Sequence, residues 1–248
     1  MAATSWIFRV VAELAQEATG IGIAKERERA MPMSNDLHAG QTLYTPRVLR
    51  AYDWVVLGLS NTLLWRCPTT VLRQLYDRNV TANHLDVGVG TGYFLDKAKW
   101  PVTTPSITLL DINTNCLDAA SSRIARYAPR TILANILTPL PALGPFRSVS
   151  LCYLLHCLPG SITDKAVLFD HLRPVLAPGA RVFGATLVQG TIPRSSPAQA
   201  LMDFYNSKGI FSNSRDTVED LDVALRDRFA FSNIKIKGCV ALFEAYVD

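Results

Sequence analysis

The feature that most constrains the fold is a short apolar run that ends in three closely spaced glycines, HLDVGVGTG at residues 84–92. An apolar run of this length that meets glycines at once is typical of a buried strand turning directly into a helix. Glycine tolerates left-handed backbone conformations and lets a ligand lie against the main chain, because it carries no Cβ. The segment therefore predicts a strand–loop–helix unit that a ligand can approach closely.

The rest of the chain continues this alternation of short apolar runs and helical patterns. Candidate strands lie at 84–88, 106–111, 131–135, 147–153 and 180–187, and candidate helices at 46–60, 68–79 and 114–127. The runs lack polar alternation, as expected for parallel strands covered on both faces. Two last runs, 231–237 and 239–247, are joined by Gly238 alone, which is too short for a parallel crossover. We predict a doubly wound α/β sheet whose last strand runs antiparallel.

The chain is long enough and apolar enough for one large domain. Its 248 residues are 49% hydrophobic, which is too much for a disordered chain, and α/β folds of about 250 residues commonly form around one sheet. The first residues carry no motif for chemistry. We expect residues 1–43 to form an N-terminal extension, helical or poorly ordered, and residues 44–248 to form the domain.

Charge, hydropathy and cysteine content argue against several classes of function. The formal net charge of +4 is spread along the chain without a basic cluster, so we expect no nucleic-acid partner. The longest uncharged stretches contain proline and fall short of the roughly 20 residues that span a bilayer, so we expect no membrane segment. The five cysteines show no C-x-x-C pair and no metal-ligand spacing. We therefore expect buried thiols, no metal, and a reducing, cytoplasmic location.

Polar residues end the next two candidate strands. Asp111 ends the second strand and Asn135 the third. Right-handed crossovers bring the carboxyl ends of these strands to one edge of the sheet. A carboxylate there can accept hydrogen bonds from both hydroxyls of a ribose, and an amide there can meet an adenine amine. The pattern indicates a ligand that contains adenosine, although Asn135 can alternatively cap the segment that follows it.

The spacing of the glycines separates the candidate ligands. A dinucleotide site uses G-x-G-x-x-G, because a pyrophosphate sits on the helix N-terminus, whereas this chain has G-x-G-x-G. Asp86, two residues before the first glycine, would repel a phosphate but suits a ligand that bears an ammonium and a sulfonium, directly or through water. S-adenosylmethionine is such a ligand. A nicotinamide-dependent oxidoreductase is the less favoured alternative.

These motifs resemble those of class I S-adenosylmethionine-dependent methyltransferases, over about residues 44–248. The matching segments are the glycine-rich loop at 86–92, the ribose segment at 109–113, the adenine segment at 135–137, the fourth strand and active-site turn at 148–160, and the helix, turn and fifth strand at 172–187. The chain departs from the family at Ala180, where L-x-P-G-G has its last glycine, and at Asn135, where many relatives carry Asp. The resemblance implies a Rossmann-like, doubly wound seven-stranded sheet with the last strand antiparallel and a helical N-terminal cap.

The resemblance also implies which residues bind the methyl donor. They are Asp86, Gly88, Gly90, Gly92, Tyr93, Asp111, Ile112, Asn113, Asn135, Ile136 and Tyr153. We add Tyr52, because an aromatic ring of the N-terminal cap can stabilise a sulfonium by a cation–π contact. Tyr44, Trp54 and Trp65 are further candidates for such a lid, although aromatic residues on helices usually belong to the core.

His156 follows the fourth candidate strand and is our candidate catalytic base. It lies beside the switch point where ligands bind in such sheets, and an imidazole can take a proton from a hydroxyl or amine near neutral pH. The alternative is a packing histidine. His38, His84 and His171 are weaker candidates, because they fall in the N-terminal arm, at a strand start and inside a helix. Three aromatic residues after the fifth strand line the substrate pocket or pack beneath its cover: Phe204, Tyr205 and Phe211.

We therefore expect a methyltransferase that uses S-adenosylmethionine, releases S-adenosylhomocysteine and acts on a small hydrophobic molecule. The resemblance is strongest to compact bacterial and fungal enzymes, some of them in natural-product pathways, so O-methylation of a polyketide-like hydroxyl is the leading hypothesis. The alternative is a protein that keeps the donor pocket but catalyses a step without methyl transfer, such as a cyclisation. A homodimer is compatible with either function.

Overall fold

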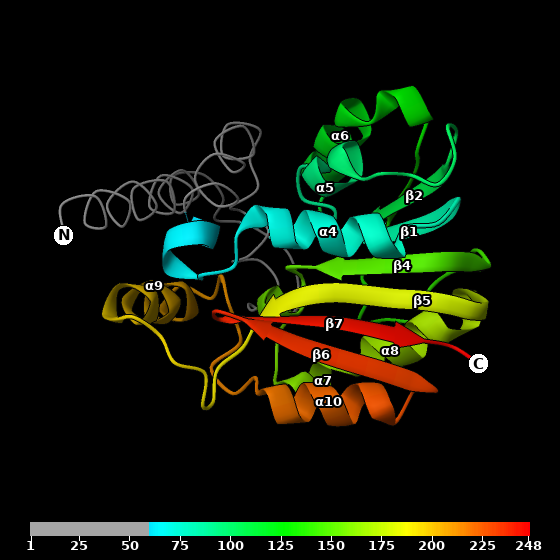
Figure 1. The fold of residues 1–248 in the computed structure, drawn as a ribbon. Coiled ribbons are helices and arrows are strands. Elements are labelled where there is room, and N and C mark those ends of the chain that lie inside the picture. The colour runs from blue at the N-terminus through cyan, green and yellow to red at the C-terminus, as the bar shows by residue number, and fades with distance from the viewer. Residues whose placement is uncertain (1–59) are drawn as a thin grey trace, which may run out of the picture.

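The computed structural model describes residues 60–248, which form one mixed sheet with helices on both faces (Figure 1). The strands are β1 (Asn83–Val87), β2 (Ser106–Asp111), β3 (Arg130–Leu133), β4 (Phe146–Cys152), β5 (Leu176–Leu187), β6 (Phe231–Lys237) and β7 (Val240–Tyr246). The sheet has seven strands in the order β3-β2-β1-β4-β5-β7-β6. β1 to β5 pair in parallel, and β7 runs antiparallel between β5 and β6. The predicted fold class is confirmed.

Two of the helices correspond to helical patterns that the sequence predicted. They are α4 (Thr69–Asn79), α5 (Tyr93–Lys97), α6 (Thr114–Arg123), α7 (Ile162–Lys165), α8 (Val167–Leu172), α9 (Ser196–Ser207) and α10 (Val218–Arg226). The expected helix at 68–79 is α4, which buries Leu72, Leu75 and Tyr76 on one face. The expected helix at 114–127 is α6 followed by a 3₁₀ turn. The extension at 1–43 and nearly all of the cap helix at 46–60 lie outside the described residues.

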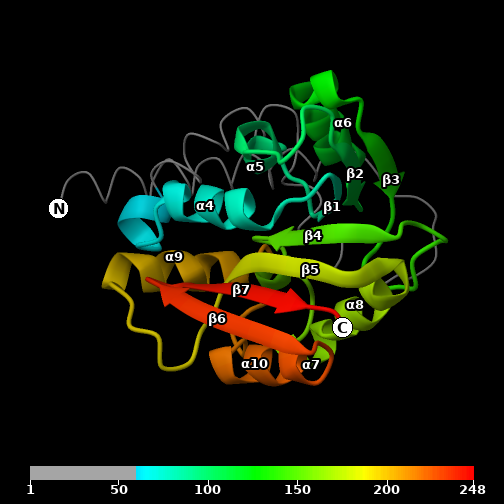
Figure 2. The ribbon, with the colours of Figure 1, turned by 45° about the vertical axis from the view of Figure 1, so that its right-hand side comes forward.

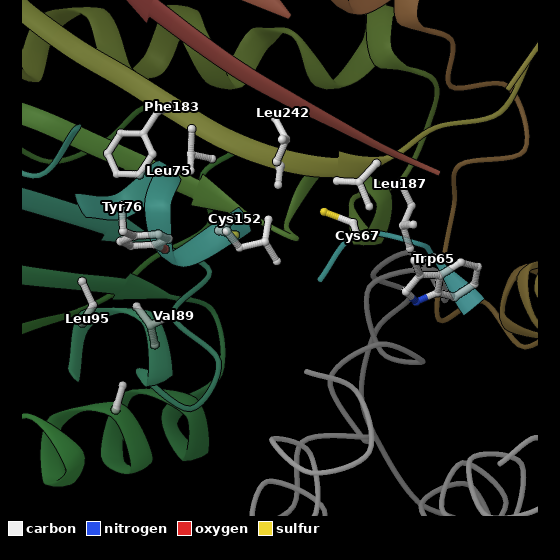
Figure 3. Close-up of a cluster of buried hydrophobic side chains, with 14 of the residues drawn as sticks. Trp65, Cys67, Leu75, Tyr76, Val89, Leu95, Cys152, Phe183, Leu187 and Leu242 are labelled. Carbon is white, nitrogen blue, oxygen red and sulfur yellow. The ribbon is translucent and has the colours of Figure 1, made fainter. Parts of the chain in front are cut away.

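Two clusters of buried apolar side chains cover the two faces of the sheet. One cluster joins the sheet to α4, α5, α6 and α9, and Figure 3 shows part of it around Tyr76, Leu95 and Phe183. The other joins the sheet to α7, α8 and α10. Figure 2 shows α4 and α10 on opposite sides of the sheet. Since both faces are covered, the strands need no polar alternation, which explains their nearly continuous apolar sequences.

A buried ion pair fixes the segment between α9 and α10. The Lys165 ammonium lies 2.6 Å from Oδ2 of Asp216 and 2.7 Å from the carbonyl oxygen of Ser212, and the Lys165 and Asp216 side chains are fully buried. Burying one such charge without its partner would be strongly unfavourable. The pair therefore holds residues 210–217 against α7.

Removal of one member of this pair should destabilise the protein. We expect Lys165→Met to lower the free energy of unfolding by about 3–5 kcal/mol, because the Asp216 carboxylate is left buried without its partner. Chemical denaturation measures the loss. Lys165→Met combined with Asp216→Leu should recover most of it, since no buried charge remains. An unchanged stability in the single variant would contradict this account of the segment.

Candidate functional site

A cavity opens at the carboxyl ends of β1, β2 and β4, where the polar residues of the sequence motifs converge. Its lining includes Asp86, Gly88, Gly90, Gly92, Tyr93, Asp111, Ile112, Asn113, Asn135, Ile136 and Tyr153. The structure therefore brings together all the predicted donor-binding residues that it describes. Tyr52 lies outside the described residues, as do Tyr44, Trp54 and His38. That the lining residues bind the donor remains a prediction.

Two positions in the loop require glycine for different structural reasons. Gly90 has φ of +51°, and a Cβ placed there would meet no atom within 4 Å. Gly92 has φ of +70°, and a Cβ there would lie 2.9 Å from the Cα of Ala120 in α6. Gly92 thus allows the loop to pack against the neighbouring helix. Gly90 exposes bare backbone to the cavity, where a ligand can lie against it.

Asp111 joins the end of β2 to the glycine loop. Its Oδ2 accepts a hydrogen bond from the backbone N–H of Val89 at 2.9 Å, and its Oδ1 accepts one from Asn113 at 2.9 Å. Burial raises the pKa of this carboxyl to about 6, against the lowering effect of these backbone donors. Each carboxylate oxygen can accept a further hydrogen bond. Asp111 is therefore equipped to receive two hydroxyls.

Asp86 lies deeper in the cavity, in a set of buried hydroxyl groups. Its Oδ1 accepts hydrogen bonds from the Tyr76 hydroxyl at 3.0 Å and from the Ser150 hydroxyl. Burial, with a smaller effect from the nearby charge of Asp111, raises the pKa of Asp86 to about 6. In the absence of a ligand, ionisation of Asp86 is costly, and a cation in the cavity would lower that cost.

The sequence analysis missed Tyr76 and Ser150 as neighbours of Asp86. The signals were present, because Tyr76 lies on the apolar face of a predicted helix and a buried tyrosine hydroxyl requires a partner. Ser150 lies opposite Asp86 in the parallel register of β1 and β4. The motifs alone did not specify that β1 and β4 are neighbours, or the register in which they pair.

Ile112, Asn113 and Asn135 also line the cavity. Oδ1 of Asn135 accepts a hydrogen bond from the backbone N–H of Leu137 at 3.0 Å. Asn135 therefore both lines the cavity and holds the turn after β3, so the two readings of this residue are compatible. Asn113 caps α6 by accepting from Asn115. Its neighbour Ile112 is 39% exposed, which leaves an apolar surface available to a ligand.

Tyr153 stands directly after β4 in a left-handed conformation, with φ of +59°. Such a conformation is uncommon for a bulky residue, and outliers of this kind cluster at functional sites. Its backbone N–H donates to the carbonyl of Ala185 at 2.7 Å, and its hydroxyl donates to Oδ1 of Asn61 at 2.9 Å. The cavity wall is thereby tied to β5 and to the residues that precede α4.

His156, the candidate base, is not among the residues that line the cavity. It is buried, and its Nδ1 accepts a hydrogen bond from the backbone N–H of Leu187 at 3.3 Å. Burial and the nearby Lys165 charge lower the pKa of His156 to about 3. An imidazole with that pKa is a weak base at neutral pH. Its catalytic role stays a prediction that these contacts do not favour.

The remaining aromatic and histidine candidates have mainly packing contacts. Trp65 is buried in the cluster on the α4 side. The ring of Phe211 lies 4.6 Å from that of His156 and 4.7 Å from that of Tyr205. Ile210, next to Phe211 in the sequence, does line the cavity. Nδ1 of His171 lies 3.0 Å from the carbonyl oxygen of Ile136, which supports the cavity from outside.

The chemistry of the lining fits a positively charged nucleoside. Among the described lining residues, two are carboxylic acids and none is lysine, arginine or histidine. A pyrophosphate would meet Asp86 and Asp111 without a compensating cation, whereas a ligand with an ammonium, a sulfonium and a ribose finds acceptors for each. These residues therefore suit S-adenosylmethionine better than a nicotinamide dinucleotide.

Fold and cavity together define the class I architecture of S-adenosylmethionine-dependent methyltransferases, and comparisons with known proteins agree. The chain is 41% identical over 208 residues to demethylluteothin O-methyltransferase from Streptomyces thioluteus, covering 84% of this chain and 90% of that protein. It is 38% identical over 218 residues to the physcion biosynthesis cluster O-methyltransferase of Aspergillus chevalieri, covering 87% and 98%. The chain belongs to this methyltransferase family.

A solved structure supports the fold. The N-methyltransferase NodS from Bradyrhizobium japonicum WM9, in complex with S-adenosyl-l-homocysteine, superimposes with a TM-score of 0.54 at 14% identity, covering 81% of this chain and 97% of that one. No family model matches the chain. Within residues 60–248, no helix is long and apolar enough to cross a membrane. That part of the chain also shows no cluster of histidine, cysteine and acidic residues that could hold a metal ion.

Gly90→Val tests whether the open backbone of the loop receives the donor. The side chain would project into the cavity, so we expect binding of S-adenosylhomocysteine to be lost in calorimetry. Gly179→Val is the matched control, because Gly179 also has a positive φ and open space around its Cβ position, but does not line the cavity. The two variants should lose similar stability through backbone strain. Retained affinity in Gly90→Val would place the donor elsewhere.

The two carboxylates predict how donor binding depends on pH. Burial raises the pKa values of Asp86 and Asp111 to about 6, so Asp111 becomes protonated as the pH falls from 7 to 5, and Asp86 does so at the same or a higher pH. We expect the affinity for S-adenosylhomocysteine to fall by about tenfold per pH unit below 6 for each carboxylate that must be ionised. Asp111→Asn should bind more weakly at pH 7 and show a shallower dependence. A constant affinity over this range would contradict the assignment.

Proposed function

We propose that this methyltransferase transfers the methyl group of S-adenosylmethionine to a hydroxyl oxygen of a small, hydrophobic natural product of the polyketide type. The observation that carries the donor half of this proposal is the cavity in which Gly90 exposes its backbone between Asp86 and Asp111. The acceptor half is supported by the relatives, which are named as O-methyltransferases of demethylluteothin and of the physcion biosynthesis cluster.

The cavity beyond the carboxylates supports an uncharged acceptor. The segment after β4 contributes Leu154, Leu158 and Pro159, and the segment after α9 contributes Ile210. These side chains offer apolar contacts and no charge. A hydrophobic molecule would gain from contact with them, whereas a charged one would lose hydration without compensation.

When bound, the donor supplies an electrophilic methyl group attached to a positively charged sulfur. The protein then has to hold that group in line with the acceptor and keep water away. We propose that Asp111 and the backbone around Gly90 fix the nucleoside, that Asp86 receives the ammonium, and that Tyr153 separates donor from acceptor. Alignment of this kind can contribute about 7–11 kcal/mol to lowering the barrier.

A general base adds less. A positioned base contributes about 10²–10⁴ in rate, and a phenolic or enolic hydroxyl is already acidic. We keep His156 as the proposed base only in this secondary role, since its pKa near 3 limits it. Replacement by alanine should then reduce turnover without abolishing it.

Several expectations accompany the proposal. They are an N-terminal extension at 1–43 outside a methyltransferase domain at 44–248, a cytoplasmic location, Tyr52 at the donor, a homodimer, and no nucleic-acid partner. They rest on the sequence. The alternative of a cyclisation without methyl transfer keeps the same donor pocket, but the named relatives do not favour it.

Incubation with methyl-labelled S-adenosylmethionine and a panel of phenolic and enolic polyketides tests the proposal. We expect the label in a methyl ether of the product, together with S-adenosylhomocysteine, because the cavity combines a donor site with an apolar acceptor side. Gly90→Val is the inactive control. An altered skeleton without label would support the cyclisation alternative, and label on nitrogen or carbon would contradict the choice of a hydroxyl.

A further inference from the structure

His84 and Asp86 belong to a buried row of polar side chains between β1 and β4. In the parallel register His84 lies opposite Ser148, and Asp86 lies opposite Ser150. Alternate residues of a strand point to the same face, so these four side chains share the face covered by α4. His84 is fully buried, and the rings of Tyr76, Trp100 and Phe183 pack around its imidazole.

Thr81 and Ser148, at the end of the row away from Asp86, fix the direction of the hydrogen bonds in the row. The Thr81 hydroxyl donates to the carbonyl oxygen of Asn83 at 3.0 Å, and a carbonyl can only accept. The Ser148 hydroxyl, 2.9 Å from that of Thr81, must then donate to it. Nδ1 of His84 lies 2.8 Å from the Ser148 oxygen. Because the proton of Ser148 is already used, His84 donates from Nδ1.

At the other end of the row, the contacts of Ser150 with His84 and Asp86 then lack one proton. Nε2 of His84 lies 2.9 Å from the Ser150 oxygen, and the same hydroxyl contacts Oδ1 of Asp86. A neutral imidazole protonated at Nδ1 and an ionised carboxylate are both acceptors, and the serine has one proton for two contacts. Both contacts can be hydrogen bonds only if a second proton resides on Asp86 or on Nε2 of His84.

We propose that Asp86 and His84, bridged by Ser150, hold one proton between them at neutral pH, and that binding of the methyl donor displaces it. This inference rests on the proposed function, in which Asp86 receives the ammonium group of the donor. His84 is then a positioning residue, because it acts on the donor through Asp86 and Ser150. It sets the charge of Asp86 and holds Ser150 against it.

Burial explains why the proton is shared. A lone charge is unfavourable at either residue, since burial raises the pKa of Asp86 to about 6 and lowers that of His84 to about 3. The two groups are 4.0 Å apart, from Nε2 to Oδ1. With one proton between them the pair has no net charge, and it keeps that proton to a higher pH than Asp86 alone would.

The other groups that face the pair do not replace this proton. Asp86 also meets Tyr76 from α4, Cys152 from β4 and the charge of Asp111 from β2, and burial raises the pKa of both Tyr76 and Cys152. None of them is a cation. The ammonium of the donor would supply the missing positive charge and would therefore compete with the proton.

Calorimetry of S-adenosylhomocysteine binding at pH 7, in two buffers with different ionisation enthalpies, measures the protons released. We expect the wild type to release a substantial fraction of one proton per site. His84→Gln keeps a donor toward Ser150 but cannot titrate, and Ser150→Ala removes the bridge with little change in volume. Both should release less than half of the wild-type amount, whereas the control Ser232→Ala, on β6 at the far edge of the sheet and outside the cavity lining, should release the full amount. Equal release in all four proteins, or a loss in Ser232→Ala, would overturn the inference.

Nitrogen NMR of histidine-labelled protein gives a second readout that does not depend on activity. The chain has four histidines, so the His84 signals can be assigned from His84→Gln. We expect Nδ1 to be protonated with and without the ligand, and the Nε2 signal to shift when S-adenosylhomocysteine binds. A neutral His84 protonated on Nε2 alone would refute the proton count. Failure of the wild type to bind S-adenosylhomocysteine at all would instead contradict the proposed donor site.

Discussion

The structure depends on two carboxylates at the ends of neighbouring strands, Asp86 buried and Asp111 partly buried, in a cavity whose described lining contains no basic side chain. Asp86 and Asp111 would each be more stable in water, and burial raises the pKa of both. The protein tolerates them because hydroxyl groups donate to Oδ1 of Asp86 and backbone N–H groups donate to both oxygens of Asp111. What these donors cannot supply is positive charge. A cationic nucleoside would supply it, which is why we propose that these two carboxylates select the methyl donor.

The fold provides the precision that this arrangement requires. β1 and β2 are held in register along their whole length, so Asp86 and Asp111 come from rigid elements instead of loops. The start of the glycine loop is held to β2, because the N–H of Gly88 bonds to the carbonyl of Leu110 and the N–H of Val89 bonds to Asp111. The glycine loop, Asp111 and Asp86 are thus held in fixed positions relative to one another.

The sequence predicted the site residues that follow directly from the end of a strand. It did not predict the residues that reach the site through the pairing of strands or the packing of helices. Asp111 and Gly90 follow apolar runs directly, so their place at the sheet edge could be foreseen. Tyr76 and Ser150 reach Asp86 only through the packing of α4 and the register of β4, which no local pattern specifies. The burial of His156 could not be foreseen for a related reason. Its position after β4 was foreseen, but the residues that bury it come from β5 and from the segment after α9.

Because Asp86 and Asp111 have no cation beside them among the described residues, the stability of the protein without its donor depends on pH. An acid whose pKa is raised to about 6 in the folded state, against about 4 in the unfolded chain, makes the folded state bind protons more tightly between those values. Its contribution to stability is therefore greatest at low pH and is lost as the pH rises through 6. The donor reverses this cost, since binding to the ionised site stabilises the folded state by mass action. The carboxylates proposed to bind the donor are thus the groups that weaken the protein without its donor when they ionise, and a stabilising change at Asp86 would be expected to reduce donor affinity.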